Sequence, residues 1–214
     1  MSESPILAFD CSTQAAGVAL LAHGRTEERA IAQGRQAAEL VDAIDALMRG
    51  ANVAYGELGA IVTTLGPGSF TGLRIALATL HGLVLAVPRP VKTLTSTEAV
   101  AWDIARWADS PEHFAIAMNA GKGEIFWQSF TNDANRPRAQ GDIELGSPEA
   151  LAGLTVPFYG NTLDPADAHY IAGPSAAVLC AIAAELPESP LSQAQPLYIR
   201  PPDAKIPEQP AWLA

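Results

Sequence analysis

The sequence is poor in basic residues and in cysteine. Its 214 residues contain 13 Lys and Arg against 23 Asp and Glu, which gives a formal net charge of −10 at pH 7. Because non-specific affinity for RNA or DNA comes from neutralising phosphates, we expect a poor nucleic-acid binder when the chain acts alone. The two cysteines, Cys11 and Cys180, form no CxxC motif. Their number and spacing suggest neither a disulfide scaffold nor a zinc module and fit a reducing compartment.

Long hydrophobic runs and a leader are also lacking. The most membrane-like run, residues 73–87, is too short to span a bilayer and contains Arg74 and His81. The first residues lead directly into 6–9 without the basic region and long apolar stretch of a signal peptide. We therefore expect a cytoplasmic protein that does not enter a membrane.

Histidine pairs with metal-ligand spacing are absent. His23, His81, His113 and His169 form neither HExxH nor HxxxH, so no helix presents two of them to one metal ion. This argues against a metalloprotease or a metal-assisted transferase site. No Ser/His/Asp arrangement can be identified from spacing either.

What is present is the pattern of a globular α/β protein, with 49% hydrophobic and 17% charged residues. Two apolar runs flank a polar turn at the start, which predicts a hairpin, and a mixed series of strands and helices follows. The predicted elements are strands at 6–10, 17–21 and 26–32, a helix at 37–50, a strand at 60–65, a helix to 87, a strand at 90–94 and a helix from Ser96 to 107. This order predicts a mixed sheet covered by helices.

The pattern restarts after Pro111. Strands at 114–118 and 124–130 flank a turn, and beyond them we expect a polar loop at 131–141, a short strand at 156–159 and a helix opened by Pro174. Two hairpin-led halves suggest two lobes. The expected divisions are an N-terminal lobe at 1–108, a smaller C-terminal lobe at 109–200 and a proline-rich tail at 201–214.

A glycine-rich turn, residues 66–72, lies between a predicted strand and a helix. It matches no phosphate-loop, GxGxxG or GxSxG motif. One reading is a structural turn, with glycines at positive φ and Ser69 or Thr71 capping the helix. The other is an anion contact at the helix N-terminus.

The tip of the first hairpin has two readings as well. Asp10, Ser12 and Thr13, with Gly68 of the glycine-rich turn, are the candidates for holding a metal-bound nucleotide. The alternative is an Asx-type turn that caps the hairpin. Cys11 is interpreted as a small buried side chain, because no base can be named for it.

The second helix is apolar on nearly all sides, so one sheet cannot bury it. Its stripe of Arg74, Ala78, His81 and Leu85 combines small and polar residues that suit an interface. Either a second protein or another helix of the same chain covers it.

These residues resemble the TsaB (YeaZ) family. The matching segments are ILAFDCST at 6–13 with GVAL at 17–20, GPGSFTGLR at 66–74, GL at 82–83, GEIF at 123–126 and PLYIR at 196–200. The family usually has Thr where this chain has Cys11, and commonly has an acidic residue and an arginine where residues 119–122 lie. The family is sometimes labelled glycoprotease-like, but no residues here support peptide cleavage.

The resemblance implies an actin-like, Hsp70-like (ribonuclease H-like) two-lobed α/β fold with mixed sheets flanked by helices. It also implies a non-catalytic subunit of tRNA threonylcarbamoyladenosine biosynthesis, which supports a TsaD-type paralogue and a TsaE-type ATPase in transferring threonylcarbamoyl to the adenosine beside the anticodon. The catalytic paralogue holds its metal with an HxxxH pair on the first helix, and this chain has no histidine there.

The resemblance places a partner surface on the first two helices. The expected interface residues are Leu40, Ile44, Leu47, Leu73, Arg74, Leu77 and His81. We expect a homodimer when the chain is alone, tRNA contact mainly through the partners, no catalytic residue, no metal and no cofactor of its own. ATP would be used by the partner subunits, and a nucleotide held between subunits stays open. The alternative is a stand-alone actin-like ATPase or small-molecule kinase that uses Asp10, Ser12, Thr13 and Gly68.

Overall fold

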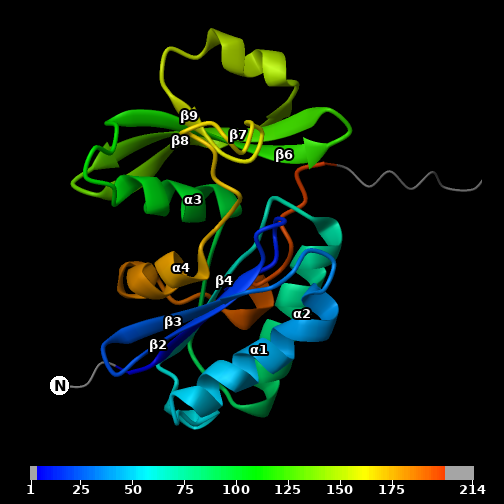
Figure 1. Ribbon diagram of the computed structural model, residues 1–214, viewed down its shortest axis with the longest axis vertical. Helices are drawn as coiled ribbons and strands as arrows, with labels where there is room; N and C mark the ends of the chain where they lie inside the picture. Colours follow the sequence, from blue (N-terminus) through cyan, green and yellow to red (C-terminus); the bar gives the residue numbers. More distant parts are fainter. Residues whose placement is uncertain (1–3, 201–214) are drawn as a thin grey trace, which may run out of the picture.

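The computed structural model of the chain describes residues 4–200 and contains two β-sheets (Figure 1). The first sheet has the strand order β3-β2-β1-β4-β5. Its strands are β1 (Ile6–Asp10), β2 (Gly17–Ala22), β3 (Arg25–Ala30), β4 (Ala60–Thr64) and β5 (Val91–Leu94). Short polar turns make β1, β2 and β3 antiparallel neighbours, whereas β4 and β5 run parallel to β1 because helices connect them.

The second sheet has the order β8-β7-β6-β9 and also begins with a hairpin. Its strands are β6 (His113–Gly121), β7 (Glu124–Asp133), β8 (Arg136–Gly146) and β9 (Phe158–Tyr159). β6, β7 and β8 are antiparallel, and the short β9 pairs parallel with β6. Each lobe is therefore a mixed sheet that starts with a hairpin.

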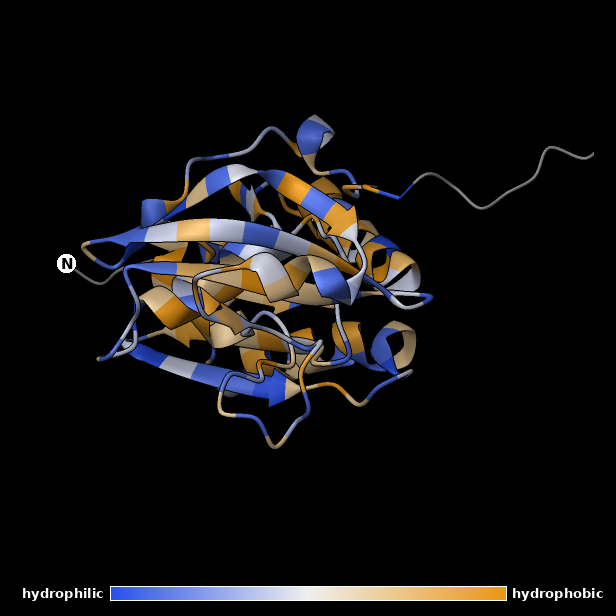
Figure 2. Ribbon diagram, turned by 90° about the horizontal axis from the view of Figure 1, so that it is seen from above, coloured by the Kyte–Doolittle hydropathy of each residue, from blue (hydrophilic) through white to orange (hydrophobic). Residues whose placement is uncertain are grey.

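Helices lie outside and between the two sheets. They are α1 (Gln36–Gly50), α2 (Phe70–Ala86), α3 (Ser96–Ala105) and α4 (Ala176–Ile182), with short 3-10 turns at Tyr55–Glu57, Pro148–Gly153, Ala183–Glu185 and Leu191–Gln193. Figure 1 shows α1 and α2 on the outer face of the first sheet, and α4 and α3 between the sheets. Hydrophobic residues concentrate toward the interior and hydrophilic ones toward the edges (Figure 2).

The core follows the helix and strand periodicities. On α1, Leu40, Ile44, Leu47 and Met48 are buried against β2, β3 and α2. A second cluster joins α4 to β1 and β2, and a third joins α3 to β6 and β7. The two lobes are thus bridged through the contact between α3 and α4.

The expected fold class, a two-lobed actin-like α/β fold with mixed sheets and flanking helices, is confirmed. The predicted polar loop at 131–141 is wrong, because β8 begins at Arg136. This strand lies at the sheet edge with both faces largely exposed, so it carries no apolar alternation. The helix expected after Pro174 exists, but α4 packs on the first sheet, although it falls within the range 109–200 assigned to the second lobe.

Two further expectations concern the ends of elements. Thr95, and not Ser96, is the N-cap of α3, and it forms a capping box with Glu98. The tail expected at 201–214 lies outside the described residues. Within residues 4–200, no helix is long and apolar enough to cross a membrane.

Candidate functional site

The carboxyl end of β1 is closed by a network around Asp10. Its Oδ2 accepts hydrogen bonds from the backbone N–H and the hydroxyl of Ser12, both at 3.0 Å, and its Oδ1 accepts one from the hydroxyl of Thr64. The bond from the Ser12 N–H makes this an Asx-type turn, so the structural reading of the hairpin tip is the one the geometry supports. Thr64 in turn accepts a bond from Ser96, which ties β1 to the start of α3.

Burial is the main cause of the pKa shifts in this network. Asp10 is only 1% exposed. Burial raises its pKa to about 6, although the bonds from Thr64 and Ser12 act in the opposite direction. Cys11 beside it is fully buried, and burial, with the charge of Asp10, raises the pKa of its thiol to about 12. The prediction that Cys11 is a buried side chain is confirmed, and its thiol stays protonated at neutral pH.

The glycine-rich turn packs directly onto this hairpin. A Cβ on Gly68 would lie 2.1 Å from the carbonyl oxygen of Ser12, and a Cβ on Gly72 would lie 1.8 Å from that of Cys11. The Ser69 N–H also donates to the Ser12 carbonyl at 2.6 Å. Gly68 and Gly72 are therefore required for close approach of two backbones, whereas Gly66 alone in this turn uses positive φ, at 101°.

Ser69 is the N-cap of α2, because its hydroxyl accepts the N–H of Gly72 at 3.2 Å. A glycine from the second half of the chain, Gly173, packs closely against Thr13, as Gly68 and Gly72 do against Ser12 and Cys11. A Cβ on Gly173 would lie 2.0 Å from the Thr13 hydroxyl, which accepts the N–H of Ala15. Glycine backbones therefore pack closely on the hairpin tip, and the N–H and hydroxyl of Ser12 are already bonded to Asp10 within the chain.

A cleft of about 1080 Å³ lies between the two lobes. Of the four candidates for nucleotide contact, Ser12, Thr13 and Gly68 line it, but Asp10 does not. Among the described lining residues there are two arginines, Arg74 and Arg200, and no Asp or Glu, which is notable in a chain of net charge −10. The cleft therefore favours anionic over cationic ligands.

The mouth of the cleft carries an exposed aromatic pair. The rings of Phe70 and Tyr198 lie 5.4 Å apart and are 53% and 48% exposed. The guanidinium of Arg74 lies 3.7 Å from the centroid of Phe70, and its Nε donates to the Tyr198 hydroxyl at 3.1 Å. Aromatic and arginine side chains of this kind are enriched in protein interfaces.

The expected partner residues divide into two groups. Leu40, Ile44, Leu47, Leu73 and Leu77 are 4% exposed or less, so these five belong to the core of this chain and offer no surface. They are buried because the apolar stripes of α1 and α2 face the first sheet and each other. Arg74 and His81 are exposed on α2, and His81 Nε2 donates to the carbonyl of Ala194 at 3.0 Å.

Sequence reasoning missed Val41, an apolar residue that reaches the surface of α1, but it had singled out Leu85 of α2. Val41 on α1 is 57% exposed, and Leu85 on α2 is 86% exposed. Leu85 belongs to the stripe identified from the helical spacing, so the periodicity predicted its place on an interface. The segment after Ala194 was missed too, because its contacts are with residues far away in the sequence.

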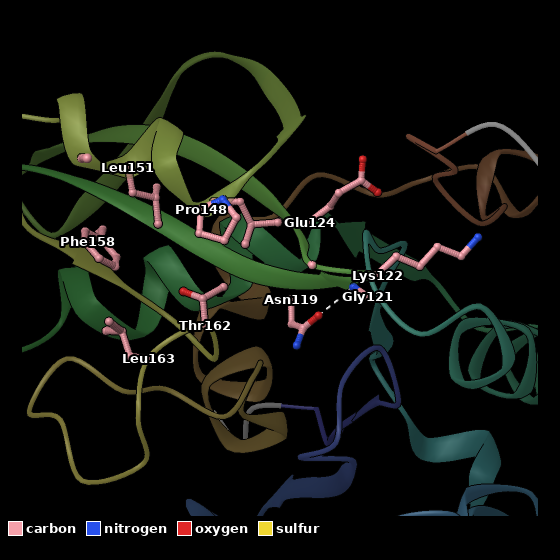
Figure 3. A pocket seen from close by; sticks show the side chains of 12 residues that line it. Asn119, Gly121, Lys122, Glu124, Pro148, Leu151, Phe158, Thr162 and Leu163 are labelled. Carbon is pink, nitrogen blue, oxygen red and sulfur yellow. Dashed lines mark hydrogen bonds between the residues drawn. The ribbon is translucent and has the colours of Figure 1, made fainter.

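A second pocket of about 550 Å³ lies in the C-terminal lobe beside the turn between β6 and β7. Leu151, Phe158 and Leu163 form its apolar side, while Lys122 and Glu124 extend away from it (Figure 3). Within the part of the chain that the structure describes, no three His, Cys, Asp or Glu side chains are grouped so that they could hold a metal ion.

Comparison with known proteins gives the family. The family model TsaD, described as tRNA N6-adenosine threonylcarbamoyltransferase, matches residues 29–200. The chain belongs to this family. Within it, the chain is similar to the tRNA threonylcarbamoyladenosine biosynthesis protein TsaB of Haemophilus influenzae, with 28% identity over 137 residues, 64% of this chain and 58% of that protein. The corresponding Escherichia coli protein is 27% identical over 61% of this chain and 56% of its own length.

A solved structure agrees over a longer range. YeaZ from Pseudomonas aeruginosa superposes with a TM-score of 0.75 at 29% identity, and the match covers 92% of this chain and 100% of that one. The resemblance to the TsaB (YeaZ) family, inferred from the GPGSFTG motif and its companions, is therefore confirmed. The match to each of the two curated relatives, in contrast, spans less than two thirds of that protein's own length.

Proposed function

We propose that the chain is a non-catalytic subunit of tRNA threonylcarbamoyladenosine biosynthesis. In this role it binds a TsaD-type paralogue and acts, with a TsaE-type ATPase, in the transfer of threonylcarbamoyl to the adenosine next to the anticodon. The chain works in the cytoplasm and needs no cofactor, and ATP is used by the partner subunits. Family membership and the TsaB relatives support the pathway. Asp10 is buried, and its carboxylate is bonded to Ser12 and Thr64, which supports the absence of catalysis.

The observation that carries the proposal is the uncharged outer face of α2. This helix of 17 residues has one Asp, Glu, Lys or Arg, which is Arg74 near its start. Beyond it the exposed positions are Ala78, His81, Gly82, Leu85 and Ala86. An exposed helix face without charge is typical of a surface that a partner covers.

Helix α1 extends this face. Ala37, Ala38 and Val41 are exposed on it, and α1 packs beside α2. Small residues allow two helices to approach closely, so the pair suits docking against helices of another chain. We define this α1–α2 face as Ala37, Val41, Ala78, Gly82 and Leu85. The same face accounts for a homodimer when the chain is alone, which competes with the heterodimer.

The test is the affinity of the purified chain for the TsaD-type paralogue of its organism, measured by calorimetry. We expect Leu85→Glu and Val41→Glu each to weaken binding by about tenfold or more, because a buried unpaired carboxylate is costly. The control is Ala152→Glu, which introduces the same charge at an exposed position of the C-terminal lobe. Equal affinity for all variants would exclude the α1–α2 face.

The stand-alone ATPase or kinase alternative predicts a nucleotide in the interlobe cleft, where Ser12, Thr13 and Gly68 lie. Titration of the isolated chain with Mg-ATP distinguishes it. We expect no heat of binding and no ATP turnover, since the N–H and hydroxyl of Ser12 are already bonded to the carboxylate of Asp10. Saturable binding with turnover that is lost in Asp10→Asn would favour the alternative.

A further inference from the structure

A short segment near the end of the described chain joins the hydrophobic cores of both lobes. Ala194 is 1% exposed and belongs to the cluster that holds α1 and α2 against the first sheet. Ile199 packs against the cluster of the second lobe, which includes Phe126 and Tyr159. Residues 194–200 therefore cross from one core to the other, and we name them the strap. In Figure 1 this segment rises beside α2 toward the end of β6.

The strap forms hydrogen bonds with the loop before α2 and with α2 itself. The Leu197 N–H donates to the carbonyl of Leu65 at 2.7 Å, just after β4. The carbonyl of Ala194 accepts the His81 ring N–H at 3.0 Å, near the C-terminal part of α2. One backbone group of the strap thus bonds to α2, and another bonds to the loop that leads into α2.

Tyr198 adds side-chain contacts at the first turns of α2. Its ring packs against Phe70, and its hydroxyl accepts a bond from Arg74 Nε at 3.1 Å. The Arg74 guanidinium also stacks on Phe70, so the three side chains hold one another in a fixed arrangement. The start of α2 is consequently attached to the strap by aromatic and charge-assisted contacts.

Arg200 attaches the strap to the other lobe. Its guanidinium donates to the carbonyl of Gly121 at 3.2 Å and pairs with the carboxylate of Glu124. The Arg200 side chain is only 21% exposed, so water screens this pair less than a fully exposed surface pair. Gly121 and Glu124 flank the hairpin turn of β6 and β7. The main contacts of α2 with other helices and strands lie in the first lobe, on β1, β4 and α1, and the strap adds a route from α2 to the second sheet.

We propose that the strap positions α2 relative to the C-terminal lobe, with Tyr198 and Arg200 as positioning residues for the α1–α2 face. This rests on the proposed function. When the Arg200 pair is intact, the first turns of α2 and the β6–β7 turn move together, and the cleft between them keeps its width. When the pair is broken, the lobes separate more widely and α2 loses the support of Tyr198, so the face binds its partner less tightly.

The first readout uses the isolated full chain. Nitroxide labels are placed by Ala86→Cys at the end of α2 and Ala152→Cys in the C-terminal lobe, both exposed positions, while the native Cys11 and Cys180 are buried. We expect Arg200→Ala to broaden the interspin distance distribution. The double variant Glu124→Arg, Arg200→Glu restores the pair with reversed charges but not the bond to the Gly121 carbonyl, so it should recover most of the narrow distribution.

The second readout is the affinity for the TsaD-type paralogue, measured without the spin labels. Arg200→Ala should weaken binding by about fivefold, the low end of typical coupling, and the charge-reversed pair should recover most of it. Arg138→Ala is the matched control, since it removes an arginine paired with Asp133 at the far edge of the second sheet. Thermal unfolding of each variant verifies that it is folded.

The two readouts separate the outcomes. An unchanged distance distribution in Arg200→Ala overturns the strap, whatever happens to affinity. A broadened distribution with unchanged affinity overturns its link to the α1–α2 face. If the native chain binds no TsaD-type paralogue, the proposed function fails, while the distance measurement still decides whether the strap holds the lobes.

Discussion

The hairpin turns that open the two lobes have the same position in their sheets but opposite environments. In the first lobe, the turn after Asp10 is buried under Gly68, Gly72 and Gly173, and its polar groups are bonded within the chain. In the second lobe, the turn from Gly121 to Gly123 has open space around both glycines and is held from outside by Arg200. One turn is part of the core, and the other is a surface attachment point.

This difference shows how one supersecondary unit can serve two purposes. The first hairpin gains rigidity by close packing of backbone on backbone at Gly68 and Gly72, although Ser12 and Thr13 also line the interlobe cleft. The strands of the second hairpin pack against α3, and its turn is held in addition by the side chain of Arg200. Rigid packing at one end and an adjustable contact at the other suit a subunit that presents a surface instead of carrying out a reaction.

The largest effect is expected at the buried turn. Gly72→Ala would place a methyl 1.8 Å from the carbonyl oxygen of Cys11, so the two backbones must separate. We expect a loss of at least about 3 kcal/mol in the free energy of unfolding, measured by urea denaturation. Gly68→Ala, at 2.1 Å from the Ser12 carbonyl, is the companion variant. A stability equal to wild type in both would contradict the close approach.

The second effect concerns pH and the buried Asp10. Its folded-state pKa of about 6 lies above the unfolded value of 3.8, so the folded state binds the proton more tightly. The resulting stabilisation is present below about pH 4 and is lost as the pH rises through about 6, with a total on the order of 3 kcal/mol. Asp10→Asn removes this dependence, so its stability relative to wild type should increase from pH 4 to pH 7.

Urea denaturation at several pH values measures this difference. Asp109→Asn, a neutralisation at an exposed position, is the control for the change in net charge. A constant difference between Asp10→Asn and wild type across the range would mean that burial does not shift the pKa of Asp10.

The exposed turn should respond more weakly. Gly123 has a φ of 78° and no neighbour within 4 Å of an added Cβ. Gly123→Ala therefore costs only the strain of an alanine in the left-handed region, about 1 kcal/mol, measured as a shift in the thermal unfolding midpoint. A loss of stability as large as that of Gly72→Ala would show that the second turn is as closely packed as the first.

The smallest effect is expected on the α1–α2 face and has the opposite sign. Gly82 is exposed within α2, and an added Cβ there has open space. Gly82→Ala should stabilise the monomeric chain, studied at concentrations too low for the homodimer, by about 0.5 to 1 kcal/mol, because alanine loses less conformational entropy in a helix. Circular dichroism during thermal unfolding measures it, and a destabilised variant would argue against open space at Gly82 in the monomer.

The sequence was most informative where local pattern determines structure. The opening hairpin, the amphipathic α1 and the Ser69 cap all follow from spacing and capping chemistry. It was least informative where distant contacts decide. Nothing local marks β8 as a strand, and nothing local indicates that Tyr198 meets Phe70 or that Arg200 meets Glu124.

The candidate site shows the same division. Periodicity identified α2 as too apolar for one sheet and placed Leu85 on an interface stripe, but the expected interface also included Leu73 and Leu77, which are core residues. That separation depends on how α2 is rotated against β1, β4 and α1, which is a property of the packed molecule. Likewise, the hydroxyls of Ser12 and Thr13 suggested a phosphate contact until their bonds within the chain were visible.

The most direct test of the central claim is the yield of threonylcarbamoyladenosine in tRNA, quantified by mass spectrometry. The TsaD-type and TsaE-type proteins of the same organism are incubated with tRNA, ATP and the threonylcarbamoyl donor, with this chain, without it, or with Leu85→Glu in its place. We predict modification with the native chain, little without it, and a reduced yield with Leu85→Glu. Equal modification with and without the chain would contradict this prediction.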